Sequence, residues 1–235
     1  MRAILVSVDY SDYLAITLPL NRHHFEDVMI VTTPDDIDTI QVAVKYDCKT
    51  FLTRCFFDNG AVFNKWLALE HGLNSLGREG WLCVMDADVV WPQVLPPFEF
   101  KPGNLYSPLR HMADFYFPEP WTKIPIHPLI SSFSGYTQIF HALDPVLTKP
   151  WYQVDWKHAG GADTFFQARW PEQNRIRPPF NVLHLGPSGV NWCGRSSPYL
   201  NGTIDPEARN RRLKLRSFKA KRTGPASTRY LHERL

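Results

Sequence analysis

Two carboxylates separated by one residue, Asp86 and Asp88, directly follow an apolar run at residues 81–85. If that run is a buried strand, Asp86 closes it and Asp88 lies two residues further on. Both side chains then reach one point outside the edge of the sheet. Such a point suits Mn²⁺ or Mg²⁺, because these ions take oxygen ligands from carboxylates, phosphates and water. A turn in which the aspartates make local hydrogen bonds is the alternative.

A third carboxylate, Asp163, follows Gly160 and Gly161 at the expected start of a helix. A carboxylate in that position is exposed enough to meet a substrate, and the helix dipole keeps it ionised. Asp163 can therefore contact a substrate in its ionised form. A simple N-cap role is the alternative reading of the same residue.

The elements that position these groups alternate between strand and helix. Apolar, β-branched runs predict buried strands, and hence a parallel sheet, at residues 3–8, 28–32 and 81–85. Apolar residues from Val62 to Leu76 recur at helical spacing, with Asp58 or Asn59 as the cap and Gly77 near the end. Further along the chain we expect a strand at 134–140, a short helix at 162–169 and a strand at 181–185. Residues 91–128, rich in proline and aromatic residues, indicate loops and short edge strands.

These residues resemble the GT-A type of nucleotide-sugar glycosyltransferases, whose D-x-D motif ends a central strand and holds the metal that bridges the donor diphosphate. Phe63-Asn64-Lys65 is similar to a segment with which some members bind the donor nucleotide. The segment 160–163 (GGAD) resembles the G-G-E-D segment of inverting, galactosyltransferase-like members. It departs from that pattern at Ala162, where the family has a glutamate that contacts the acceptor sugar.

The resemblance implies an α/β fold of GT-A type, with a Rossmann-like, mixed and mainly parallel central sheet flanked by helices. It implies one catalytic domain over residues 1–208, with a nucleotide-binding half at about 1–90 and an acceptor half at about 91–208. It also implies that Asp163 deprotonates the acceptor hydroxyl. His184, which follows an apolar run, is implied as a third metal ligand beside Asp86 and Asp88. A core histidine with satisfied hydrogen bonds is the alternative for His184.

The donor nucleoside is expected where the first two strands end, beyond the carboxyl ends of the sheet. Tyr10 offers a ring face to the base, and Asp9 or Asp35 offers an acceptor to a uracil N–H or a ribose hydroxyl. Helix capping by Asp12 or Asp35 is an equally good reading. A loop after His184 is expected to fold over the donor. The expected donor-binding residues are Val8, Asp9, Tyr10, Thr33, Asp35, Asn64, Lys65, Asp86, Gly189 and Trp192.

Composition supports a folded protein, since 44% of the 235 residues are hydrophobic and 21% are charged. The basic residues are concentrated at the end of the chain: residues 1–208 hold 16 Lys and Arg against 22 Asp and Glu, whereas residues 209–235 hold 10 against one. That tail is either a solvated helix with a loose end or an arm that binds a polyanion. No apolar run is long enough to span a membrane and no signal peptide is evident, so we expect a cytoplasmic protein.

Several other classes of protein are disfavoured. The absence of G-x-G-x-x-G and of a P-loop argues against a dehydrogenase and a P-loop NTPase. His23 and His24 lack a carboxylate at metal-binding spacing and are expected to face solvent. A sugar-phosphate nucleotidyltransferase normally carries a glycine-rich loop after its first strand, which this chain lacks. A non-catalytic nucleic-acid-binding module would explain the tail but not the acidic motifs.

The sequence therefore predicts a metal-dependent, inverting glycosyltransferase that moves a sugar from a UDP-sugar or related donor to a hydroxyl acceptor. The basic tail suggests DNA with 5-hydroxymethylated bases as the acceptor, as in phage-type DNA glycosyltransferases, which would place the enzyme in the host cytoplasm. Aromatic residues between Phe115 and Trp121 would receive the flipped base. Glycan or lipopolysaccharide precursors are the alternative acceptors, with the tail on anionic lipid.

Overall fold

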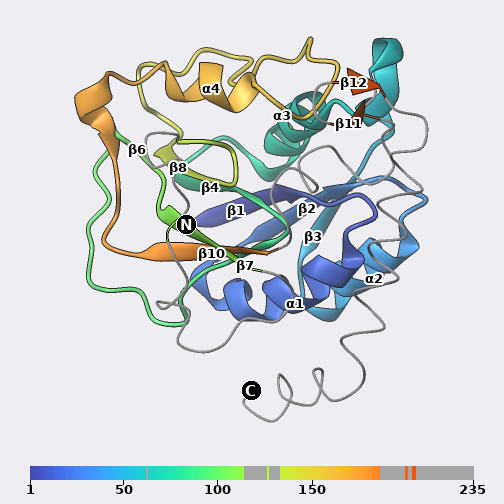
Figure 1. The fold of residues 1–235 in the computed structure, drawn as a ribbon, viewed down its shortest axis with the longest axis horizontal. Helices are drawn as coiled ribbons and strands as arrows, with labels where there is room; N and C mark the ends of the chain where they lie inside the picture. The colour runs from blue at the N-terminus through green and yellow to red at the C-terminus, as the bar shows by residue number, and fades with distance from the viewer. Residues whose placement is uncertain (62, 114–125, 127–132, 186–198, 201–202, 205–235) are drawn as a thin grey trace.

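The computed structural model describes residues 1–61, 63–113, 126, 133–185, 199–200 and 203–204 (Figure 1). Four features predicted from the sequence lie outside this part of the chain. They are Gly189, Trp192, the aromatic segment 115–121 and the basic tail 209–235.

The core of the fold is a seven-stranded sheet in the order β3-β2-β1-β4-β8-β6-β9. Its strands are β1 (Arg2–Val6), β2 (Val28–Thr32), β3 (Lys49–Leu52), β4 (Trp81–Asp86), β6 (Leu105–Tyr106), β8 (Thr137–His141) and β9 (Arg175–Ile176). Four of the six neighbouring pairs are parallel, and β8 runs antiparallel to both of its neighbours. The predicted mixed, mainly parallel sheet of an α/β protein is therefore confirmed.

Helices cover both faces of this sheet (Figure 1). They are α1 (Ser11–Asn21), α2 (Ile37–Lys45), α3 (Lys65–Leu76) and α4 (Ala162–Gln167), with 3₁₀ turns at Arg22–His24, Cys55–Gly60 and Glu172–Asn174. Because successive strand residues point to opposite faces, Leu5 packs in a core with residues of α1, whereas Ile4 packs with residues of α3. At Gly72 of α3 an added Cβ would lie 2.5 Å from Val31 Cγ2, so this close approach of helix and strand requires glycine.

A second, three-stranded sheet has the order β5-β10-β7. Its strands are β5 (Val89–Val90), β7 (Leu109–Ala113) and β10 (Asn181–Leu185), and β10 runs antiparallel to β5 and parallel to β7. A separate pair, β11 (Tyr199–Leu200) and β12 (Thr203–Ile204), is antiparallel. The second sheet matters for function because β5 directly follows Asp88 and β10 carries His184.

Some predicted elements have different bounds or caps. The first strand ends at Val6 rather than at residue 8, and the strand expected at 134–140 spans Thr137–His141. The third helix begins at Lys65, and its N-cap is Asn64 rather than Asp58 or Asn59. The physical reason is that the Asn64 side chain accepts a hydrogen bond from the Leu67 N–H at 3.0 Å.

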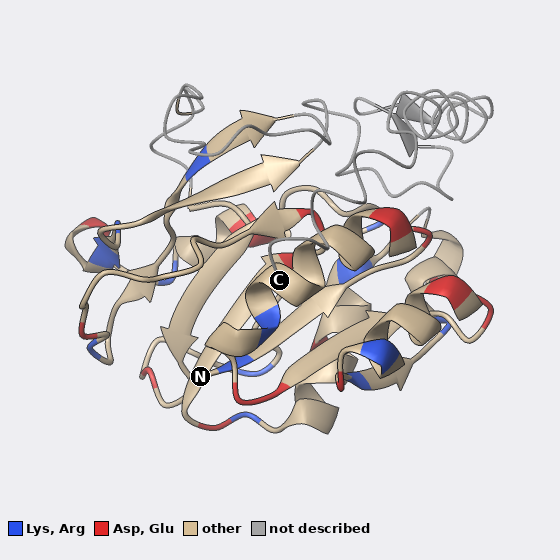
Figure 2. Cartoon of the chain, turned by 90° about the horizontal axis from the view of Figure 1, so that it is seen from below, with Lys and Arg blue, Asp and Glu red and all other residues tan. Residues whose placement is uncertain are grey.

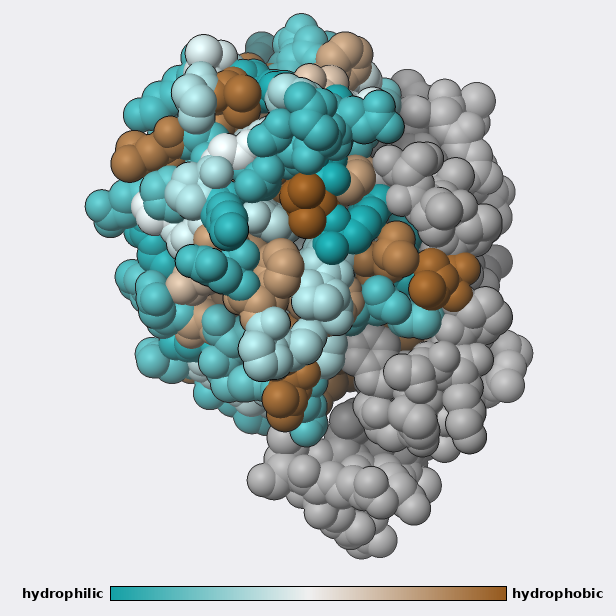
Figure 3. Space-filling view, turned by 90° about the vertical axis from the view of Figure 1, so that its left-hand side faces the viewer, coloured by the Kyte–Doolittle hydropathy of each residue, from teal (hydrophilic) through white to brown (hydrophobic). Residues whose placement is uncertain are grey.

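Charged residues lie mainly in loops and at the ends of elements, while the central strands are almost free of them (Figure 2). On the face shown in Figure 3, apolar side chains occur in small groups among hydrophilic ones. Among the described helices, none combines the length and the apolar character needed to cross a membrane. Cys48, Cys55 and Cys83 are free thiols.

Candidate metal and donor site

The three expected metal ligands meet at one point. The antiparallel pairing of β10 with β5 places His184 opposite Val89, and the Leu185 N–H donates to the Asp88 carbonyl at 2.8 Å. One ligand atom each of Asp86, Asp88 and His184 lies within 4.8 Å of the others. The His184 Nε2 atom is 3.1 Å from Asp88 Oδ1. Two carboxylates and one imidazole form a donor set that fits Mn²⁺ or Mg²⁺, with positions left for phosphate oxygens and water.

A lysine lies against this group. Lys65, the first residue of α3, forms an ion pair with Asp86 through Nζ and Oδ1. Its side chain is only 11% exposed, and its Nζ also lies 4.8 Å from the centre of the Trp66 ring. A positive charge is therefore fixed at the carboxyl end of β4 in a partly buried place, where charges interact more strongly than in bulk water.

The segment that carries Asp88 is held by α1. Thr17 Oγ1 donates to the Ala87 carbonyl at 2.6 Å, and Asn21 Nδ2 donates to the Val89 carbonyl at 2.7 Å. Asn21 Oδ1 accepts from the Trp91 N–H at 2.8 Å. Thr17 and Asn21 are both buried. Sequence reasoning missed them, because nothing in a buried threonine or asparagine shows which backbone groups it will bind.

Asp163 reaches the same region from α4. Its Oδ2 accepts a hydrogen bond from the Gly135 N–H at 2.8 Å, and the carbonyl of the following residue, Tyr136, accepts from the Asp86 N–H at 3.0 Å. The dipeptide Gly135-Tyr136 thus binds the side chain of Asp163 through one residue and the backbone of Asp86 through the other. The N-cap of α4 is Gly161, at φ 100°, so the alternative capping role of Asp163 is not what the structure shows.

The expected nucleoside residues lie at the adjacent ends of β1 and β2. Asp9 has a φ of 60°, and its N–H donates to Asp36 Oδ2 at 2.8 Å. Asp36, not Asp35, caps α2 by accepting from the Thr39 N–H. Asp35 is exposed and paired with Arg54, whose hydrogen bond lowers the pKa of that carboxyl. The capping alternative for Asp35 is therefore wrong.

The remaining expected donor residues are more enclosed. Val8 and Tyr10 are 4% and 7% exposed, and the Tyr10 ring stacks on Tyr13 at 5.8 Å. Thr33 is buried, and its carbonyl accepts from the Asp36 N–H at 3.2 Å. Besides capping α3, Asn64 donates from Nδ2 to the Val154 carbonyl at 2.6 Å. Both polar atoms of its amide are therefore used within the protein, and Asn64 fixes the start of the helix that presents Lys65.

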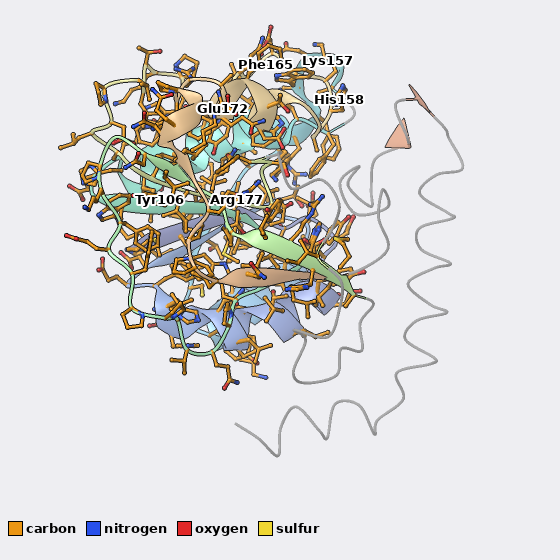
Figure 4. All side chains as sticks on the ribbon, turned by 60° about the vertical axis from the view of Figure 1, so that its left-hand side comes forward. Tyr106, Lys157, His158, Phe165, Glu172 and Arg177 are labelled. Carbon is orange, nitrogen blue, oxygen red and sulfur yellow. The ribbon has the colours of Figure 1, made fainter. Side chains whose placement is uncertain are left out.

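A separate hollow of about 440 Å³ lies beside α4, lined by residues 148–153 together with Phe165, Phe166 and Arg169. Asp163 and Gln167, also on α4, do not line it, and they accept hydrogen bonds from the Gly135 and Phe133 N–H groups. Figure 4 shows Phe165 close to Lys157 and His158 at one end of the molecule. None of Asp86, Asp88 and His184 lines this hollow, so it is not part of the metal site.

No family model and no curated protein matches the chain. Similar solved structures include the mannosyltransferase PcManGT from Pyrobaculum calidifontis in complex with GDP-Man and Mn²⁺, at 14% identity and a TM-score of 0.48. The alignment covers 80% of this chain and 57% of that chain, so this chain spans less than two thirds of the mannosyltransferase.

Two further structures are more distant. Mannosyl-3-phosphoglycerate synthase from Rubrobacter xylanophilus aligns at 16% identity and a TM-score of 0.36, over 47% of this chain and 40% of that chain. A nucleoside-diphosphate-sugar pyrophosphorylase from Vibrio cholerae aligns at 11% identity and a TM-score of 0.40, over 91% and 100%. Since all three TM-scores are below 0.5, these alignments assign neither activity nor substrate to this chain.

Proposed function

We propose that this protein is a metal-dependent glycosyltransferase that moves a sugar from a nucleotide-diphosphate donor to a hydroxyl acceptor. The observation that supports this most is the grouping of Asp86, Asp88 and His184 within 4.8 Å where β4 ends. Open α/β sheets bind their ligands beyond the carboxyl ends of the parallel strands, and this group lies there.

Asp86, Asp88 and His184 would hold Mn²⁺ or Mg²⁺. The bound ion supplies electrostatic stabilisation of the negative charge that develops on the departing diphosphate. Lys65 adds a second positive charge at the same place, since its ammonium lies against Asp86. The rest of the donor would extend toward the ends of β1 and β2. There Val8, Asp9, Tyr10, Thr33 and Asp35 would contact the nucleoside, which we propose to be uridine. Gly189 and Trp192 stay predictions from the sequence.

Asp163 would act as the general base. The Gly135 N–H fixes its carboxylate, and the dipeptide Gly135-Tyr136 separates it from the metal ligands. A base on the far side of the sugar from the diphosphate takes the proton of the acceptor hydroxyl while that oxygen attacks the anomeric carbon, which inverts the configuration. We propose 5-hydroxymethylated bases in DNA as the acceptor, on the basis of the basic tail. Glycan and lipopolysaccharide precursors form the second acceptor class.

Titration calorimetry with UDP and GDP, with and without Mn²⁺, tests the donor site. We expect Mn²⁺ to strengthen nucleotide binding by the native chain, and Asp88→Asn to abolish that enhancement because it removes a ligand charge. Asp163→Asn should keep the enhancement. The matched control is Asp155→Asn, which changes an exposed carboxylate and should alter nothing. If Mn²⁺ has no effect on nucleotide binding by the native chain, a non-catalytic binding protein becomes the better description.

A product screen tests the transfer reaction and its acceptor. A panel of UDP- and GDP-sugars is incubated with hydroxymethylated DNA or with glycan acceptors, and products are identified by mass. We expect a hexose-sized mass increase on one acceptor class with the native chain, and none with Asp163→Asn. Transfer by Asp163→Asn at the native rate would contradict the role of that residue as base.

A further inference from the structure

An arginine from the second sheet lies against the metal site. Arg110 belongs to β7, next to the strand that carries His184, and its Nη1 is 3.4 Å from His184 Nδ1. Its guanidinium carbon is 4.6 Å from the centre of the Tyr136 ring, and that ring stacks on His184 at 6.2 Å. Within the described part of the chain, no carboxylate comes within ion-pair distance of Arg110. The arginine is therefore placed by a ring and a histidine rather than by an acidic partner.

The hydrogen bonds of His184 are informative. An arginine side chain can only donate, so His184 Nδ1 accepts from Arg110 and Nε2 carries the ring proton, which faces Asp88 Oδ1 at 3.1 Å. A metal-ligating histidine usually has the reverse arrangement, in which the nitrogen away from the metal donates to an acceptor. If Nε2 holds a metal ion, the ring proton is on Nδ1, and Arg110 loses its hydrogen bond. The guanidinium is then available to another acceptor at the same place.

The charges of the site indicate what that acceptor is. Asp86 and Asp88 carry two negative charges, and Lys65 and Arg110 carry two positive ones. A divalent ion alone would raise the total to two positive charges, with Arg110 beside one of the ligands. A diphosphate that links a nucleoside to a sugar carries two negative charges and restores neutrality. The planar guanidinium fork also matches two phosphate oxygens, which a metal ion by itself does not need.

We propose that Arg110 binds the diphosphate of the donor and thereby makes the binding of metal and donor depend on each other. The proposal rests on the function proposed above. Before binding, Arg110 donates a hydrogen bond to His184, and its positive charge repels a divalent ion that approaches the site. With metal and diphosphate both present, the same arginine contacts phosphate oxygens, and the Tyr136 ring supports the guanidinium from one side. The metal ion alone should therefore bind weakly, and bound nucleotide should increase the affinity for the metal ion.

The test is Arg110→Met, which removes the charge and keeps an unbranched apolar side chain over Tyr136. Free Mn²⁺ is measured by its electron paramagnetic resonance signal, with and without UDP, and UDP binding is measured by calorimetry in saturating Mn²⁺. We expect Arg110→Met to bind Mn²⁺ alone more tightly than the native chain, and UDP in Mn²⁺ about tenfold more weakly, which is an ordinary size for coupling between two ligands. These opposite signs are not expected from a general loss of structure.

Lys45→Met is the matched control. Lys45 is also a cation above a tyrosine, with Nζ 5.1 Å from the centre of the Tyr46 ring, but it lies on α2. It should leave both affinities unchanged. Arg110→Lys keeps the charge without the fork, and it is expected to bind Mn²⁺ alone as the native chain does but UDP more weakly. This second variant also gives an answer if Arg110→Met does not fold.

The outcomes separate the two proposals. If the native chain shows Mn²⁺-dependent UDP binding and the two Arg110 variants match it, the role of Arg110 is refuted while the proposed function stands. Weaker binding of both Mn²⁺ alone and UDP by Arg110→Met would also refute the proposal, since it would show only structural support of His184. Absence of Mn²⁺-dependent UDP binding by the native chain would overturn the proposed function and this inference with it.

Discussion

Replacing Asn21 by alanine removes two buried hydrogen bonds from the segment that follows Asp88. The Val89 carbonyl loses its donor at 2.7 Å, and the Trp91 N–H loses its acceptor at 2.8 Å. An unsatisfied buried polar group costs about 1–3 kcal/mol, and alanine returns about 0.5 kcal/mol through its higher helix propensity. With two such groups, we therefore expect the free energy of unfolding to fall by about 1.5–5.5 kcal/mol.

Urea unfolding measures this loss. Asn21→Asp has the same shape and keeps the acceptor for Trp91 but loses the donor to Val89, so it should also destabilise the fold, which separates hydrogen bonding from loss of volume. Gln41→Ala, at an exposed position of α2, should change the free energy of unfolding by no more than about 0.5 kcal/mol. Under conditions where Asn21→Ala remains folded, its Mn²⁺ affinity should be lower than that of the native chain. A destabilisation by Asn21→Ala equal to that of Gln41→Ala would refute the reasoning.

Two further predictions concern the base and the pH dependence of stability. In Gly135→Ala the new Cβ would lie 2.8 Å from Trp66 Cη2 and 3.1 Å from Asp163 Cβ. This overpacking should lower the free energy of unfolding, measured with urea, by about 1–3 kcal/mol and displace the Asp163 side chain. Sugar transfer by this variant at the native rate would count against the assigned geometry. Burial lowers the pKa of His24 from 6.5 to about 4. As the pH falls, His24 therefore takes up a proton in the unfolded chain before it does so in the folded chain. The contribution of neutral His24 to the free energy of unfolding is complete above pH 6.5 and is lost as the pH falls toward 4. His24→Gln should flatten thermal stability against pH over that range. His23→Gln, which removes only the smaller effect of the neighbouring charge on the His24 pKa, should flatten it less, and equal slopes in the two variants would exclude His24 as the cause.

The prediction that both neighbouring histidines face solvent was wrong for one of them. His23 is exposed, and its Nε2 contacts the Gln93 carbonyl at 2.9 Å. His24 is partly buried, with its ring 5.6 Å from that of Trp91. The sequence did not show this, because Trp91 is 67 positions away along the chain and only the tertiary structure brings it to the histidine.

The strands of the site were predictable, whereas α1 was not. The strand preceding Asp86 and the strand containing His184 were recognised as apolar runs, since buried strands of a parallel sheet are hydrophobic on both faces. The buried face of α1 includes Ser11, Thr17 and Asn21, and the helix contains Pro19. Polar residues on a buried face hide the helical period of the apolar ones, and proline argues against a helix interior. Two of these polar residues, Thr17 and Asn21, are the ones that hold the segment after Asp86.

The sequence by itself determined the α/β class, the parallel strands and the pair Asp86 and Asp88, because local apolar runs and motif spacing encode these features. His184 was expected beside them only from the resemblance to GT-A glycosyltransferases, and the tertiary structure brings it to the pair. Only the tertiary structure showed that Lys65 pairs with Asp86, that Arg110 lies on His184, and that the Gly135-Tyr136 dipeptide connects Asp163 to Asp86. The contact between Arg110 and His184, for example, joins residues 74 positions apart. Partners at such separations are chosen by strand order and register, which no local pattern in the chain specifies.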